Sequence, residues 1–175
     1  MITHSRPTLD ESDRKAVLNV LVSGHLVQGK QVARFEGDLA SFVGVKHGVA
    51  VSSGTAALHL SLLALDVGPG DEAILPTFVC DALLQAVSYT GATPVLADID
   101  PRTFNIAPSD LEKRITKKTK AVIVPHMFGL PADMAEILSL GIPVIEDCAQ
   151  AVGAKYNGVR VGSLGKMSIF SFYAT

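Results

Sequence analysis

Several features are scarce or missing in this 175-residue sequence, and each absence excludes a class of protein. Tryptophan is absent. A membrane-spanning helix requires about 20 consecutive apolar residues, and no apolar run in the sequence approaches that length. The first residues lack the apolar segment of a secretory signal. The net charge is −2 without a basic stripe, so nucleic acid is not an expected partner. We therefore expect a cytoplasmic protein that contacts neither membrane nor nucleic acid.

Cysteine is also rare, with only Cys80 and Cys148 in the chain. The two lie far apart and belong to no Cys-x-x-Cys pair, so we expect two buried, reduced thiols. The five histidines are scattered without the spacing that metal ligands usually have. The sequence therefore predicts neither a disulfide nor a metal site.

Two common nucleotide-binding motifs are missing as well. No G-x-G-x-x-G sequence occurs, which counts against the dinucleotide site of a nicotinamide-dependent reductase. Gly165-Lys166 resembles the end of a P-loop, but Arg160 stands where that motif needs its first glycine. A phosphate-binding P-loop is therefore excluded.

Short apolar segments alternate along the chain with stretches of helical periodicity. Strands are predicted over residues 47–51, 72–75, 94–97, 121–124, 142–145 and 167–172. Helices are predicted after residue 11, around 32–42 and 58–65, over 81–89, from 109 and over 131–140. This order is typical of parallel strands under helical cover. We expect one continuous α/β unit without repeats or linkers.

Capping and turn signals mark the ends of several predicted elements. Thr8-Leu9-Asp10-Glu11 and Ser109-Asp110-Leu111-Glu112 both have the form of a capping box. Gly24 is expected to end the first helix, and Asn157-Gly158 is typical of a hairpin turn. The first helix should present an apolar face formed by Ala16, Val17, Val20 and Leu21.

A pair of carboxylates follows one of the predicted strands. Val144 and Ile145 lead into Glu146-Asp147, and Gln150 comes three residues after Asp147. In open α/β sheets, ligands bind in the crevice beyond the carboxyl ends of the strands. Asp147 is therefore a candidate ligand-binding residue, although loops and caps also use aspartate freely.

Small residues occupy the predicted strand-to-helix turn Ser52-Ser53-Gly54-Thr55-Ala56. The free N–H groups of a helix N-terminus favour a phosphate, and small side chains allow its close approach. An ordinary turn capped by serine or threonine would have the same composition, so both interpretations stay open.

Phe78 and Ser171 are two further candidates. Phe78 follows a predicted strand, where its ring could stack on a flat cofactor or pack in the core. Ser171 alternates with Phe170 and Phe172, so on a strand it would face away from both aromatic rings. It could bind a ligand or simply be a small residue on the polar face.

Together these signals describe a ligand with a phosphate, a flat ring and a ring atom that attracts a carboxylate. Pyridoxal 5'-phosphate (PLP) has all three features. A carboxylate beside its pyridine nitrogen keeps that nitrogen protonated, because a nearby opposite charge favours the charged form. The protonated ring then acts as an electron sink for a carbanion at the substrate carbon.

With these residues in view, the sequence resembles the DegT/StrS-type nucleotide-sugar aminotransferases, which are PLP enzymes of the aspartate aminotransferase class (fold type I). The resemblance is carried by motifs at residues 28–36, 53–58, 68–72, 98–101, 126–134, 146–151 and 170–172. It implies that residues 1–175 comprise an N-terminal arm and most of the PLP-binding large domain, with a mostly parallel sheet between helices. The smaller C-terminal domain of the family is missing.

The resemblance also implies a role for each candidate residue. Gly54, Thr55 and Ala56 would bind the cofactor phosphate through their backbone N–H groups. Ser171 would bind the same phosphate through its hydroxyl. Three other residues would contact the ring. Phe78 would stack on its face, Asp147 would pair with its nitrogen, and Gln150 would approach its 3-oxygen.

The implied reaction is transfer of an amino group, usually from glutamate, to a nucleotide-linked keto sugar by a homodimer. The family's Schiff-base lysine would stand five residues after Ser171, immediately after Thr175 and outside the printed sequence. Lys166 stands five residues before Ser171 and is expected to be a solvated surface lysine. The truncation just before the lysine therefore leaves the catalytic residue unknown.

Two alternatives remain open at this stage. Some family members have histidine in place of the lysine and act as PLP-dependent sugar dehydratases, and the position that decides this follows Thr175. If the protein ended at Thr175, it would instead be a non-catalytic binding or regulatory fragment.

Overall fold

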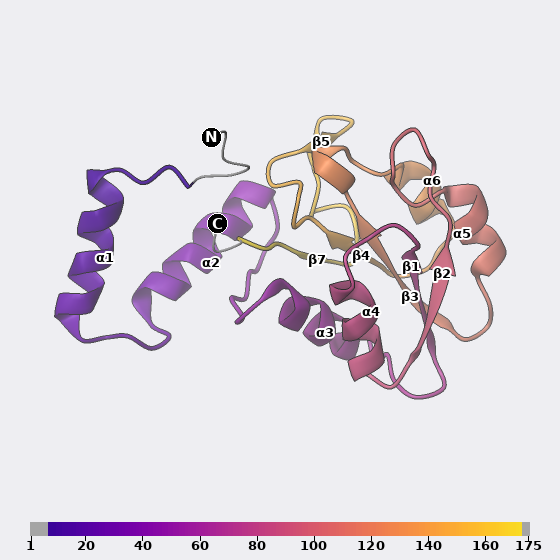
Figure 1. Cartoon of the computed structure of the whole chain (residues 1–175), viewed down its shortest axis with the longest axis horizontal. Helices are drawn as coiled ribbons and strands as arrows, with labels where there is room; N and C mark the ends of the chain where they lie inside the picture. Colours follow the sequence, from indigo (N-terminus) through magenta and orange to yellow (C-terminus); the bar gives the residue numbers. More distant parts are fainter. Residues whose placement is uncertain (1–6, 173–175) are drawn as a thin grey trace, which may run out of the picture.

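The computed structural model describes residues 7–172, and its centre is a five-stranded sheet (Figure 1). The strands are β1 (Glu72–Pro76), β2 (Thr93–Ala97), β3 (Thr119–Pro125), β4 (Val144–Asp147) and β7 (Met167–Ile169). Their order across the sheet is β2-β1-β3-β4-β7, and every neighbouring pair is parallel. The predicted parallel α/β unit is confirmed.

Helices flank this sheet and extend beyond it. They are α1 (Glu11–Ser23), α2 (Lys30–Val43), α3 (Gly54–Ala64), α4 (Ala82–Tyr89), α5 (Pro108–Arg114) and α6 (Met134–Ser139), with a 3-10 turn η1 (Met127–Gly129). None of the helices described has the length and hydropathy needed to cross a bilayer.

Two apolar layers hold the helices against the sheet, because successive strand residues point to opposite faces. Leu75, Ile123 and Ile145 pack with α3 and α4, whereas their neighbours Ile74, Val122 and Val144 pack with α5 and α6. Both faces of the strands are therefore buried, which explains their continuous apolar sequences. The paired registers bring the carboxyl ends of the strands to one edge of the sheet.

Helices α1 and α2 lie to one side of the sheet (Figure 1). Helix α2 buries Ala40 and Val43, whereas α1 buries no residue in the described part of the chain. The predicted apolar face of α1 is therefore largely exposed there, since Val17 and Leu21 are more than half exposed. Gly24 ends α1 in a left-handed conformation, as predicted.

One predicted strand does not form. Residues 47–51 lie outside every strand of the described chain, and the Ala50 N–H donates to Glu36 Oε1 at 2.8 Å. The segment passes so close to α2 that a Cβ on Gly48 would lie 2.8 Å from the Glu36 carbonyl oxygen. A side-chain anchor to α2 thus replaces the expected ladder, a contact that sequence periodicity cannot reveal.

Three predicted helix starts are displaced. Asp10 caps α1 and completes a capping box with Asp13, so Thr8 is not the cap. Helix α5 starts at Pro108, because proline suits the first helical position, and its cap is Ala107, whose side chain cannot accept a hydrogen bond, so Ser109 is not the cap. Helix α6 starts at Met134 after Asp133, which shortens the predicted helix.

The remaining differences are smaller. Strand β4 covers residues 144–147 and β7 ends at residue 169, so Ser171 follows a strand and does not lie within one. The predicted hairpin is confirmed: β5 (Lys155–Tyr156) and β6 (Val159–Arg160) pair antiparallel around Asn157 and Gly158, which both have positive φ.

Both cysteines are free, as predicted, but only Cys148 is buried. Cys80 is exposed because it follows the carboxyl end of β1, outside the two apolar layers. Lys166 is exposed, as expected.

Candidate cofactor site

Asp147 is the last residue of β4 and lies at the carboxyl edge of the sheet. Its side chain is buried, and Oδ1 accepts a hydrogen bond from the Ala149 N–H at 3.0 Å. Among residues 7–172, Oδ2 accepts no hydrogen bond. Burial raises the pKa of the Asp147 carboxyl, although the Ala149 N–H opposes this effect. A cationic group at Oδ2 would stabilise the ionised carboxylate.

The N-terminus of α3 lies beside Ser171. A Cβ added to Gly54 would lie 3.2 Å from the Ser171 Cβ and 3.3 Å from its Oγ, so a larger residue would fit only if Ser171 shifted slightly. Ser53 caps the helix by accepting from the Ala56 N–H at 3.1 Å. The N–H groups of Gly54 and Thr55 have no partner within the described chain. The fold therefore brings two free donors close to a hydroxyl, which suits an anion.

Phe78 follows β1 and is 46% exposed, which argues against the core-packing interpretation. Its ring lies 5.3 Å from that of Phe104, and its own surface stays accessible to a flat ligand. Phe78 and Asp147 share the carboxyl edge of the sheet but are separated by β3 in the strand order.

Gln150 is exposed and lies close to the turn after β3. Its Oε1 accepts a hydrogen bond from the Phe128 N–H at 3.1 Å. Because the oxygen is engaged, the amide nitrogen is left to donate. A ligand atom beside Gln150 would therefore be an acceptor, such as a phenolate oxygen.

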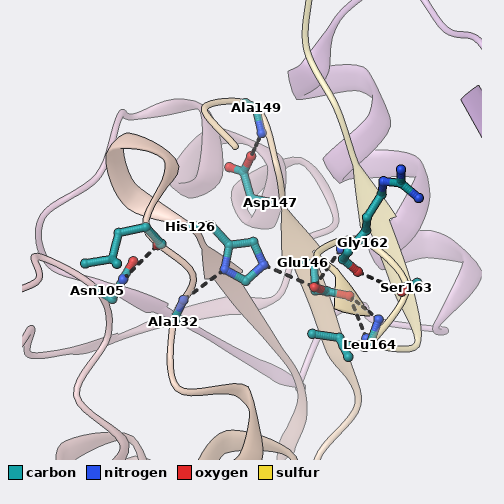
Figure 2. Close-up of polar contacts among 12 residues, drawn as sticks. Asn105, His126, Ala132, Glu146, Asp147, Ala149, Gly162, Ser163 and Leu164 are labelled. Carbon is teal, nitrogen blue, oxygen red and sulfur yellow. Dashed lines mark hydrogen bonds and ion pairs between the residues drawn. The ribbon is translucent and has the colours of Figure 1, made fainter. Parts of the chain in front are cut away.

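Sequence reasoning missed a fully buried pair beneath Asp147, formed by His126 and Glu146 (Figure 2). Glu146 Oε2 accepts from His126 Nε2 at 3.1 Å and from the Gly162 N–H at 2.8 Å. Its Oε1 accepts from the N–H groups of Leu164 at 2.8 Å and Gly165 at 2.6 Å. The carboxylate thus ties the loop before β7 to the strand that carries Asp147.

The tautomer of His126 follows from its second nitrogen. Nδ1 accepts from the Ala132 N–H at 3.1 Å, so the ring hydrogen is on Nε2 and is donated to Glu146. Burial by itself would raise the pKa of Glu146, but the hydrogen bonds from His126 and three backbone N–H groups outweigh it and lower that pKa. The adjacency of a second carboxylate to Asp147 was the only sequence signal for this network.

His126, Glu146 and Cys148 place potential metal-ligand atoms within 4.8 Å of one another. The imidazole and the carboxylate are already engaged in the hydrogen bonds above, and burial raises the pKa of the Cys148 thiol. The group is therefore explained as a structural network without an ion.

Comparison with known proteins decides the family. The model of the DegT/DnrJ/EryC1/StrS aminotransferase family matches residues 7–175. The chain belongs to this family. It is 46% identical over 174 residues to a UDP-N-acetyl-3-dehydro-alpha-D-glucosamine 3-aminotransferase of Acidithiobacillus ferrooxidans, covering 97% of this chain and 47% of that protein. It is 44% identical over 177 residues to a GDP-perosamine synthase of Caulobacter vibrioides, covering 98% and 48%.

Among solved structures, a Streptococcus pneumoniae protein described as a sugar aminotransferase, in its PMP form, superposes with a TM-score of 0.96 at 32% identity. The match covers 99% of this chain and 48% of that one. The expected fold of this aminotransferase family is thereby confirmed. The chain spans about half the length of the curated relatives it matches.

Proposed function

We propose that the intact protein is a PLP-dependent aminotransferase that moves an amino group from glutamate to a nucleotide-linked keto sugar. The observation that carries this proposal is Asp147, a buried carboxylate at the carboxyl edge of the sheet with one oxygen available to a ligand. The activities for which the relatives are named, a UDP-sugar 3-aminotransferase and a GDP-perosamine synthase, support amino transfer as the reaction and a nucleotide-linked sugar as the substrate.

The residues present fit PLP by the chemistry of their donors and acceptors. Two free N–H groups and a hydroxyl meet where α3 begins, and a Cβ on Gly54 would fill the space beside Ser171. Gln150 offers a donor, Asp147 an acceptor and Phe78 an accessible ring. When bound, PLP supplies an electron sink for charge that develops at the substrate carbon.

Each residue then has one task. Gly54, Thr55 and Ser171 hold the phosphate by hydrogen bonds. Ala56 contributes less than the resemblance implies, because its N–H already donates to Ser53. Asp147 keeps the pyridine nitrogen protonated, since its negative charge favours the positive form.

Two residues orient the ring itself. The Gln150 amide donates to the ring's 3-oxygen, and Phe78 covers one ring face and excludes water from it. These roles are proposals for the intact protein. The residue that would bond to the cofactor, expected after Thr175, lies outside the described residues.

We also propose that residues 1–175 form an N-terminal arm and most of the cofactor-binding large domain, and that the intact protein is a homodimer. Support for dimerisation comes from α1, whose apolar side chains Val17, Leu18, Leu21 and Val22 are each more than half exposed. The cytoplasmic location remains a prediction.

The function is tested on the intact protein with added PLP. Equilibrium dialysis should show stoichiometric binding, and mass spectrometry should show transfer of nitrogen-15 from labelled glutamate to a nucleotide-linked keto sugar. A folded protein that binds no PLP would refute the proposal. A dehydrated sugar without label would instead identify the dehydratase alternative.

A further inference from the structure

Three phenylalanine rings form a row beside the proposed cofactor site. Phe78, Phe104 and Phe128 are 46%, 41% and 67% exposed. The ring centroids of Phe78 and Phe104 are 5.3 Å apart, and those of Phe104 and Phe128 are 6.1 Å apart in an edge-to-face arrangement. Rings that remain this exposed are not explained by burial in the core, so the row needs another reason.

The backbone that presents two of these rings is in a disfavoured conformation. Phe104 has a φ of 60° and Phe128 a φ of 55°, both in the left-handed region. A bulky side chain rarely adopts this conformation, and it persists only where the surrounding contacts impose it. Such strain is concentrated at functional sites.

One buried side chain joins the two strained turns. Asn105 is 3% exposed and follows Phe104 directly. Its Oδ1 accepts from the Met127 N–H at 2.9 Å, and its Nδ2 donates to the Leu130 carbonyl oxygen at 3.0 Å. These two bonds bracket Phe128, so the amide holds the loop of Phe104 and the turn of Phe128 in one fixed arrangement.

This arrangement touches two of the proposed cofactor-binding residues. The Phe104 ring contacts the ring of Phe78. The Phe128 N–H donates to Gln150 Oε1 at 3.1 Å and thereby leaves the Gln150 amide nitrogen free to donate. The same group of residues therefore contacts both Phe78, proposed to stack on the face of the cofactor ring, and Gln150, proposed to bind at its edge.

We propose that Phe104, Asn105 and Phe128 form a brace that positions Phe78 over the cofactor ring and Gln150 beside it. The inference rests on the proposed function, because Phe78 and Gln150 need this placement only if PLP binds between them. The Phe104 ring limits the rotation of Phe78, and the Phe128 N–H sets the orientation of the Gln150 amide. The three brace residues act through Phe78 and Gln150 and are therefore positioning residues.

Two variants of the intact protein remove the rings of the brace and leave its backbone hydrogen bond to Gln150 in place. Phe104→Leu keeps an apolar side chain but removes the ring that contacts Phe78. Phe128→Gly removes the second ring, suits the left-handed backbone and keeps the N–H that bonds Gln150. Phe42→Leu is the matched control, because Phe42 is 43% exposed and its ring contacts Arg160 and, among residues 7–172, pairs with none of the three rings of the row.

PLP titration followed by cofactor fluorescence measures the dissociation constant, and visible circular dichroism at saturation reports the asymmetry around the bound ring. We expect both brace variants to raise the dissociation constant about 3- to 10-fold, the range for losing one aromatic pair. The dichroism band should change in both. Both brace variants should keep the wild-type melting temperature in the cofactor-free protein, and Phe42→Leu should keep the wild-type PLP affinity and dichroism.

Wild-type affinity and dichroism in both brace variants would overturn the brace while leaving the proposed function intact. An equal effect of Phe42→Leu would also overturn it. A wild-type protein that binds no PLP would instead refute the proposed function, and the brace with it.

Discussion

Two adjacent carboxyl groups, Glu146 and Asp147, have opposite environments and therefore opposite tasks. Glu146 receives four hydrogen bonds, which lower its pKa and keep it ionised inside the protein. Asp147 receives one, so burial raises its pKa and its free oxygen lacks a partner within residues 7–172. The first residue is structural, and we propose that the second binds a cationic ligand atom.

Asp147→Asn tests the second task. The neutral amide cannot stabilise a protonated pyridine nitrogen, so we expect turnover to fall by about 100-fold or more, the scale of losing one preorganised electrostatic group. Anchoring of the phosphate should persist, so PLP should still bind. Steady-state kinetics of the intact protein and PLP titration measure the two effects. Asp38→Asn, an exposed helix residue, is the control, and wild-type turnover in Asp147→Asn would remove this assignment.

Glu146→Gln tests the first task through stability. The NH2 group of the new glutamine is a donor and must face backbone N–H groups that are also donors. We therefore expect the free energy of unfolding at pH 7 to fall by about 3 kcal/mol or more. The pKa of Glu146 is lower in the folded state than its ordinary value of 4.5. Its stabilisation is therefore complete above pH 4.5 and is lost as the pH falls through the folded pKa.

Urea denaturation at a series of pH values measures this difference. The gap between wild type and Glu146→Gln should shrink steadily below pH 4.5, because wild-type Glu146 then becomes protonated. Glu112→Gln, on the exposed surface of α5, should show no such pH dependence. A gap that stays constant down to pH 2 would contradict the assigned role.

At the scale of the element, the start of α3 is shaped by a close approach of two chain segments. Gly54 is the first helical residue, and Ser171 follows β7, which pairs with β4. A methyl group in the space between them would require a small shift of the Ser171 side chain. The anion site thus depends on a helix N-terminus and on a segment delivered by the opposite end of the chain.

Gly54→Ala should therefore weaken PLP binding about tenfold. The new methyl group must displace the Ser171 side chain, which then loses its hydrogen bond to the phosphate. Loss of one hydrogen bond to a charged group changes a dissociation constant by about this factor. PLP titration of the intact protein measures the change. The control is Gly37→Ala, since Gly37 lies within α2 and nothing lies within 4 Å of an added Cβ. Gly37→Ala should leave PLP affinity unchanged and stabilise the protein by about 0.5–1 kcal/mol. Equal affinities in both variants would contradict the proposed phosphate site.

At the scale of the whole molecule, the outstanding feature is the lack of packing around α1. Its first turn is well capped, yet the helix buries no side chain in the described chain. Apolar side chains at Leu18, Leu21 and Val22 share one helical face and remain exposed. A helix of this length is marginal in water by itself, so a packing partner is needed to stabilise it.

If that partner is a second copy, the intact protein should sediment as a dimer and the double variant L18E/L21E should sediment as a monomer. Charged side chains on the apolar face would have to be desolvated in the interface, which opposes association. Analytical ultracentrifugation measures the masses. The variant N19E, at an exposed polar position of the same helix outside the face of Leu18, Leu21 and Val22, is the control. A wild-type monomer, or a dimer unaffected by L18E/L21E, would contradict this arrangement.

The alternation of elements, the parallel sheet and the candidate residues at the strand ends were all predictable from the sequence, because these features depend on local periodicity and on the chemistry of short segments. The sequence also indicated five candidate site residues, but it did not show how they contact one another: Gly54, Phe78, Asp147, Gln150 and Ser171. Helix starts were displaced where a neighbouring residue took the cap, as Asp10 does in α1 and Ala107 does before Pro108 in α5. The strand predicted at 47–51 was wrong because the anchor to Glu36 is a tertiary contact.

Only the tertiary structure decided which polar groups satisfy one another. The His126–Glu146 pair, the Asn105 brace and the approach of Gly54 to Ser171 each join segments far apart in the chain. Such contacts depend on strand order and register, which no local pattern specifies. The same physics explains why Asp147, and not Glu146, is open to a ligand: neighbouring residues of a strand face opposite sides, and only the fold determines what lies on each side.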